Sequence, residues 1–247
     1  MKRLLLPALL LTTLTACTAA PAGTLPASTP APTAAPAPAD ALTLEEKIGQ
    51  LFIIRPDALD LTLPQETIND AKADGVTMLT DAMRETLQAY PVGGICQFGK
   101  NITDPEQLAQ FNADLQAASR TPLFIAVDEE GGAVARLANH PAFDLPQYES
   151  AAAVGASGDP ADACAMGQTI GAYLKEYGFN MDFAPDADVN TNPDNPIIGT
   201  RAFSSDAATA AEMAAAAAAC APAASCRRSS ISPATVIPLR TATPRWP

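Results

Sequence analysis

The stretch IAVDEEGGAVARL, residues 125–137, decides the fold that we expect for this chain. Apolar residues open it, three consecutive acids follow, and two glycines then allow the backbone to turn sharply. A buried strand end cannot hold three unpaired carboxylates cheaply, so these acids must face solvent, a cation or the polar groups of a ligand. For Glu129 we prefer a salt-bridged strand end, and Arg136 can return to pair with one of the acids. For Asp128, the position at the strand tip favours contact with a ligand.

Strand-like and helix-like segments alternate along the rest of the chain. Thr43, followed by Glu46 three positions later, predicts a helix N-terminus with a capping box. Apolar runs and apolar periodicity predict strands over 50–54, 92–99, 122–128 and 179–190 and helices over 104–119 and 160–177. This order predicts an α/β domain built around a parallel sheet.

Acidic residues follow the strands expected at 122–128 and 179–190, which favours a barrel whose chemistry gathers at the carboxyl ends of its strands. A doubly wound sheet is the alternative, but no G-x-G-x-x-G motif follows a strand. We therefore predict a partial (β/α)8 barrel of the TIM type over residues 41–213, comprising roughly the first four βα units. Half of such a barrel would leave strand edges unpaired.

The composition argues against several classes of partner. The net charge is −12 across 247 residues and there is no basic block, which argues against nucleic acid. The single histidine, His140, rules out a His-rich metal site, and we predict no cofactor. The cysteines at 96, 164, 220 and 226 follow neither a CxxC pattern nor a regular spacing, so the sequence predicts neither a metal site nor a disulfide among them.

Residues 1–17 have the pattern of an export signal peptide, with Lys2 and Arg3 before mainly apolar residues and the sequence LTAC ending at Cys17. LTAC resembles a bacterial lipobox, which implies lipidation of Cys17, and the alternative is an ordinary secretory signal with a chance cysteine. A Pro-, Ala- and Thr-rich linker over 18–40 favours the lipobox, because such a linker keeps the chain extended as a spacer. We therefore expect an exported protein that is lipid-anchored to the outer face of the bacterial cell membrane.

Four stretches resemble segments of glycoside hydrolase family 3, and they follow one another along the chain in the same order as in the family. PLFIAVDEEGGAVARL (122–137) resembles the family's P-L-x-I-x-x-D-x-E-G-G-x-V-x-R segment, and LTLEEKIGQLF (42–52) resembles its start. VGGICQFGKNI (92–102) is similar to its second strand, and GFNMDFAPDADVNTNPDNPIIGTRAF (178–203) to a later strand and the loop after it. The resemblance implies a TIM-type barrel and retaining hydrolysis of β-linked sugars through an aspartate nucleophile.

The same resemblance assigns roles to three side chains. It implies that Asp128 accepts sugar hydroxyls and that Arg136 and Arg201 bind substrate, which suits a carboxylate with two acceptor oxygens and a guanidinium with a fixed fork. The family often has arginine where this chain has Ala133, which weakens the local ion pairing. By contrast, we expect the aspartates at 186 and 188 to tie the loop after their strand.

The sequence changes character after residue 213. An alanine-rich run at 214–219 predicts a helix, although no cap or packing partner can be identified for it. The family's K-H-F-P-G-H-G-D-T-A-T-D-S-H segment is absent from the chain. A DNA sequence that encodes this segment can be written with freely chosen codons. When that DNA is translated one base late, it gives the sequence of residues 230–243. We therefore interpret the end of region 214–247 as an out-of-frame reading of the segment, and a genuine disordered tail is the alternative.

This interpretation has a chemical consequence. Retaining hydrolysis needs a nucleophile and an acid/base on either side of the scissile bond, and the resemblance implies that this chain lacks both. The out-of-frame motif implies the β-N-acetylhexosaminidase branch, whose substrates are β-linked N-acetylglucosaminide sugars such as cell-wall fragments. A non-catalytic sugar-binding lipoprotein and a non-functional fragment are the two alternatives.

Overall fold

The computed structural model describes residues 41–221 and the strand at 226–227. The signal peptide and linker expected over 1–40, the lipidation expected at Cys17 and the out-of-frame segment at 230–243 lie outside the described residues. Within the described part, no helix is long and apolar enough to cross a membrane.

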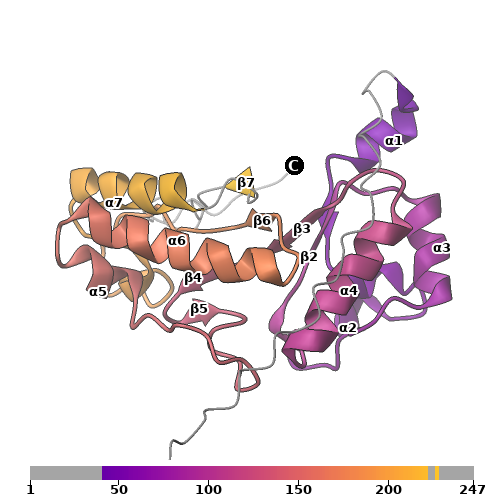
Figure 1. Cartoon of the computed structure of the whole chain (residues 1–247), viewed down its shortest axis with the longest axis horizontal. Coiled ribbons are helices and arrows are strands. Elements are labelled where there is room, and N and C mark those ends of the chain that lie inside the picture. The colour runs from indigo at the N-terminus through magenta and orange to yellow at the C-terminus, as the bar shows by residue number, and fades with distance from the viewer. Residues whose placement is uncertain (1–40, 222–225, 228–247) are drawn as a thin grey trace, which may run out of the picture. The chain divides into compact units, whose positions relative to one another are not determined.

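Helices and strands alternate as the sequence predicts. In chain order they are α1 (Leu44–Gly49), β1 (Ile53–Ile54), η2 (Pro56–Leu59), α2 (Gln65–Asn69), α3 (Asp81–Ala89), β2 (Gly94–Cys96), η3 (Gly99–Asn101), α4 (Pro105–Ala118), β3 (Phe124–Val127), β4 (Glu129–Gly131), β5 (Val134–Ala135), α5 (Ala151–Gly155), α6 (Pro160–Glu176), β6 (Met181–Asp182), η4 (Gly199–Arg201), α7 (Ala207–Cys220) and β7 (Cys226–Arg227) (Figure 1).

One parallel sheet organises these elements. Its strand order is β1-β2-β3-β6-β7, and each neighbouring pair is parallel. All four predicted strands are confirmed as β1, β2, β3 and β6. No strand among the described residues joins β1 to β7, so the sheet is open there, as expected of a partial barrel.

Local sequence signals explain where the helices begin. Thr43 forms the predicted capping box with Glu46 at the start of α1. Aspartate side chains cap α4 and α6, and each of these helices has proline in its first turn. The apolar positions that predicted both helices are buried, namely Leu108, Phe111, Leu115 and Ala118 in α4 and Met166, Ile170, Tyr173 and Leu174 in α6.

The alanine-rich helix corrects one expectation. The run at 214–219 belongs to α7, which Asp206 caps and which packs along α6 (Figure 1). Gly167 of α6 permits this approach, since a Cβ there would lie 2.1 Å from the Ala217 carbonyl oxygen. The predicted helix is therefore confirmed, and the expectation that it lacks a cap and a packing partner is wrong, because neither feature is visible within the alanine run itself. The boundary expected at residue 213 falls inside this helix.

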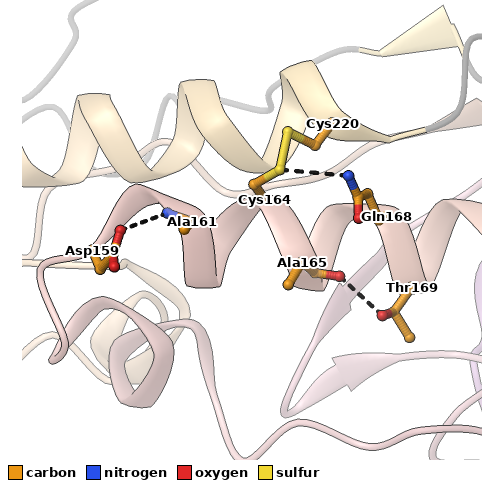
Figure 2. Close-up of a disulfide and its surroundings, with 7 residues drawn as sticks. All are labelled: Asp159, Ala161, Cys164, Ala165, Gln168, Thr169 and Cys220. Carbon is orange, nitrogen blue, oxygen red and sulfur yellow. Dashed lines mark hydrogen bonds between the residues drawn. A yellow bond between two sulfur atoms is a disulfide. The ribbon is translucent and has the colours of Figure 1, made fainter.

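The absence of a disulfide is a second wrong prediction. Cys164 of α6 and Cys220 of α7 form a disulfide across the helix pair (Figure 2). The two residues are 56 positions apart in the sequence. They meet only because the helices pack side by side, so their spacing gave no signal.

Candidate functional site

A pocket of about 460 Å³ lies at the carboxyl ends of the parallel strands. It is lined by Ile53, Ile54, Arg55, Cys96, Phe98, Asp128, Glu130, Phe183 and Arg201. Two of the three predicted site residues, Asp128 and Arg201, therefore lie in its wall. A second cavity, between α6, α7 and β6, has a volume of about 30 Å³ and holds no more than a few water molecules.

Asp128 and Arg136 form a bidentate ion pair at the tip of β3. Arg136 Nε donates to Asp128 Oδ1 over 2.7 Å, and Arg136 Nη2 contacts Asp128 Oδ2. This hydrogen bonding to the carboxylate raises the pKa of Arg136. Arg136 thus returns to pair with an acid, as expected, and it holds the carboxylate that lines the pocket. Each Asp128 oxygen keeps a lone pair that can accept a further donor.

Glu130 and Arg201 form a second bidentate pair, between residues 71 positions apart. Arg201 Nε and Nη2 donate to the two Glu130 carboxylate oxygens over 2.7 Å each. Arg201 Nη2 also lies 3.6 Å from Asp186 Oδ2. Because Glu130 and Asp186 are both buried, this guanidinium neutralises carboxylates that have little access to water.

Glu129 corrects the expectation of a salt-bridged strand end, because hydrogen-bond donors without a charge surround its buried carboxylate. Oε2 accepts from the backbone N–H groups of Arg136 (2.5 Å) and Leu137 (2.9 Å). Oε1 accepts from the Ala138 N–H and the Tyr173 hydroxyl, each over 2.9 Å. Burial raises the Glu129 pKa and these bonds oppose the rise. The turn at the glycine pair brings the 136–138 backbone back onto this carboxylate.

Two further acids lie behind the pocket wall. Asp182 at the end of β6 accepts from the Glu129 N–H over 3.0 Å, and burial raises its pKa well above the usual value. Burial also raises the pKa of Asp186 to about 6. The Asp188 N–H donates to Asp186 Oδ1 over 2.9 Å, which confirms that Asp186 ties the loop after its strand.

Sequence reasoning missed several parts of the pocket. Glu130 was passed over as one of three adjacent acids, and nothing marked it as the partner of an arginine in a distant loop. Arg55 follows the predicted run at 50–54, which was a usable signal. Cys96 and Phe98 lie inside the predicted run at 92–99, and only the structure shows that β2 ends at Cys96. Burial raises the pKa of the Cys96 thiol to about 12, which keeps that thiol neutral. Among the described residues, no group of three or more His, Cys, Asp or Glu side chains is arranged to hold a metal ion.

One protein family and several known proteins match this sequence. Residues 43–224 match the family described as "Glycosyl hydrolase family 3 N terminal domain". The chain is 34% identical over 143 residues to beta-hexosaminidase A of Pseudoalteromonas piscicida, covering 56% of this chain and 24% of that protein. It is 33% identical over 139 residues to a beta-hexosaminidase of Stenotrophomonas maltophilia strain K279a, covering 55% of this chain and 40% of that one.

Solved structures show the same likeness. A glycoside hydrolase family 3 beta-N-acetylglucosaminidase from Paenibacillus sp. strain FPU-7 superposes with a TM-score of 0.58 at 33% identity, covering 72% of this chain and 31% of that one. A beta-N-acetylhexosaminidase from Beutenbergia cavernae gives a TM-score of 0.58 at 30% identity, covering 74% and 51%. The alignments span only 24% and 40% of the two relatives that match in sequence.

Proposed function

Because this chain belongs to glycosyl hydrolase family 3, we propose that its strand-end pocket binds a β-linked N-acetylated amino sugar of the kind that β-N-acetylhexosaminidases hydrolyse. Asp128 carries this proposal, since a carboxylate fixed by Arg136 lines a pocket of about 460 Å³ at the expected end of the sheet. The names of the similar proteins, hexosaminidases and a beta-N-acetylglucosaminidase, support an amino sugar as the ligand.

Each residue of the site has a distinct role in this proposal. Asp128 accepts hydrogen bonds from sugar hydroxyls, because its oxygens have lone pairs beyond those that Arg136 occupies. Arg136 is absent from the pocket wall and acts by orienting Asp128. Arg201 lines the wall, held by Glu130, and its remaining N–H groups can donate to a hydroxyl or an acetamido oxygen.

We further propose that this chain binds the sugar without cleaving it. A retaining glycosidase needs one carboxylate free to attack and a second group that exchanges a proton with the leaving oxygen. Both carboxylates that line the described pocket, Asp128 and Glu130, are held in bidentate pairs by arginines. Such pairing occupies both oxygens of each carboxylate, which suits binding better than nucleophilic attack. This favours the alternative of a non-catalytic sugar-binding lipoprotein.

Binding and turnover can be measured on the same preparation. We expect a calorimetric titration with N-acetylglucosamine to show saturable binding that Asp128→Asn weakens by about tenfold, the cost of replacing a charged hydrogen-bond acceptor with a neutral one. We expect no release of p-nitrophenol from p-nitrophenyl N-acetyl-β-glucosaminide above the rate without protein. Hydrolysis that Asp128→Asn abolishes would contradict the second proposal, and the absence of binding would contradict the first.

Two further proposals concern the lipid anchor and the C-terminal tail, which lie outside the described residues. We propose that Cys17 carries a lipid and that residues 230–243 are read out of frame. In the host bacterium, the wild-type protein should partition into the detergent phase of a Triton X-114 extract, whereas Cys17→Ser should stay in the aqueous phase. Sequencing the gene across codons 214–247, together with the mass of the C-terminal peptide, tests the reading frame. An uninterrupted frame whose peptide has the mass of the printed sequence would refute that part.

A further inference from the structure

Arg55 differs from the other arginines of the site because no carboxylate pairs with it among residues 41–221. Arg136 and Arg201 each form a bidentate ion pair, with Asp128 and Glu130 respectively. Arg55 lies between β1 and η2 and lines the same pocket, yet its only hydrogen bond within the described part runs to a backbone carbonyl. Its positive charge is therefore not neutralised by a carboxylate in the described part of the pocket.

The Arg55 guanidinium is nevertheless held in a defined place. Its Nη1 donates to the Ile68 carbonyl over 3.0 Å, and its Cζ lies 4.4 Å from the centre of the Phe98 ring. The Ile68 carbonyl also accepts from Lys100 Nζ over 3.2 Å, and Lys100 Nζ lies 3.3 Å from the buried Asp57 carboxylate. The carbonyl that supports Arg55 thus belongs to α2, which Lys100 also holds in place, so the guanidinium is preorganised.

Most of the hydrogen-bonding capacity of this guanidinium is unused. An arginine side chain carries five N–H donors, and within the described part of the chain only Nη1 has an acceptor. Neutral sugar hydroxyls could use the remaining donors, but they would not compensate the positive charge. An anionic group would do both, because a planar guanidinium matches a carboxylate or a phosphate and charge-assisted hydrogen bonds are roughly twice as strong as neutral ones.

We propose that Arg55 binds an anionic substituent of the sugar, so that the pocket prefers an acidic N-acetylated amino sugar to a neutral one. This inference rests on the proposed function, because it takes the amino sugar as the ligand. It adds that the ligand carries a carboxylate or a phosphate. A structural brace is the competing role for Arg55, and it predicts that Arg55 affects stability without any preference for acidic ligands.

Three probes separate these roles on the full-length chain. N-Acetylmuramic acid differs from N-acetylglucosamine only by a lactyl ether with a carboxylate, and N-acetylglucosamine 6-phosphate supplies a phosphate. By calorimetry we expect at least one acidic sugar to bind about tenfold more tightly than N-acetylglucosamine, which is the usual gain of a hydrogen bond to a charged group. We also expect raising the salt from 50 to 500 mM to reduce this preference, as it does for exposed charges.

Variants then assign the preference to one side chain. In Arg55→Gln the acidic sugar should lose its higher affinity, while the affinity for N-acetylglucosamine changes less than about twofold. Arg55→Lys should keep part of the preference, because lysine retains the positive charge but lacks the planar guanidinium that pairs with two oxygens. Arg120→Gln is the matched control, since it removes a charge from an exposed pair with Glu46 outside the pocket. It should leave the preference intact.

The outcomes distinguish this inference from the proposed function. If none of the three sugars binds, the proposed function is wrong. If N-acetylglucosamine binds but neither acidic sugar binds better, or if the preference survives in Arg55→Gln, the inference is wrong and the proposed function stands. The wild-type preference and its salt dependence need no variant, so they decide the case even if Arg55→Gln does not fold.

Discussion

Replacing Glu129 with leucine is expected to lower the free energy of unfolding by at least about 4 kcal/mol. The change removes the acceptor of three backbone N–H groups, from Arg136, Leu137 and Ala138, and of the Tyr173 hydroxyl. Each buried donor left without a partner costs about 1–3 kcal/mol. A loss of this size is a large fraction of the roughly 5–15 kcal/mol that stabilises a typical domain, so urea unfolding at neutral pH should show it clearly.

Graded substitutions test whether the hydrogen bonds cause this loss. Glu129→Gln keeps one acceptor oxygen and should fall between the wild type and the leucine variant. Tyr173→Phe removes a single donor and should cost about 1 kcal/mol. Glu85→Leu, at an exposed position of α3, is the control and should change stability by less than about 0.5 kcal/mol. If the leucine and glutamine variants are equally stable, the carboxylate does not organise this turn.

Loosening the turn that Glu129 holds should also affect the pocket. The 136–138 backbone that Glu129 holds carries Arg136, and Arg136 orients the pocket-lining Asp128. A variant that loosens this turn while the domain stays folded should therefore weaken sugar binding without touching a residue of the pocket wall. Tyr173→Phe, the mildest change, is suited to this measurement, since Tyr173 contacts the carboxylate from α6.

The contrast between Glu129 and Asp128 shows what the sequence could predict. The strand, the acids at its tip and the turn at the glycine pair are local features, and the helix start at Thr43 is equally local. These were predicted correctly because the chain neighbours of each residue decide them. The partners of Glu129 were not, since the Tyr173 hydroxyl reaches it from 44 positions away.

Partners that lie even further apart in the sequence were not predicted either. The resemblance to the family marked Arg201 as a site residue, but nothing in the sequence indicated that Glu130, 71 positions earlier, would hold it. Likewise, the cysteines at 164 and 220 become partners only after α6 and α7 pack together. Such pairs depend on how elements dock in three dimensions, so a pattern of residue types along one segment cannot reveal them.

The Arg201–Glu130 pair gives the second large effect. Arg201→Met should cost about 3–5 kcal/mol at pH 8, because removing one partner of a buried ion pair leaves an uncompensated charge. Glu130 is 5% exposed and Asp186 is 2% exposed, so both carboxylates depend on the guanidinium more than on water for compensation of their charge. The double variant Arg201→Met with Glu130→Gln should recover much of the loss, since it removes the stranded charge as well. Chemical unfolding of the single and double variants measures this coupling.

The pH dependence of this loss has a definite sign. Burial raises the pKa of Asp186 to about 6 from an ordinary value of 3.8. Between those two values the folded chain binds more protons than the unfolded chain, so stability falls as the pH rises through this window. Removing Arg201 takes away a positive charge that lowers this pKa, so the window should extend upward and the deficit of Arg201→Met should shrink from pH 8 to pH 5. A deficit that is constant over this range would mean that lost packing, and not a stranded carboxylate, causes the destabilisation.

The double variant also separates stability from recognition. With Arg201→Met and Glu130→Gln combined, the buried charges around Asp186 are reduced and the fold should be largely restored, yet the pocket has lost the N–H groups that we assign to the sugar. We expect this folded variant to bind N-acetylglucosamine at least about tenfold more weakly than the wild type. If binding returns together with stability, Arg201 only neutralises Glu130 and Asp186, and recognition rests on Asp128 instead.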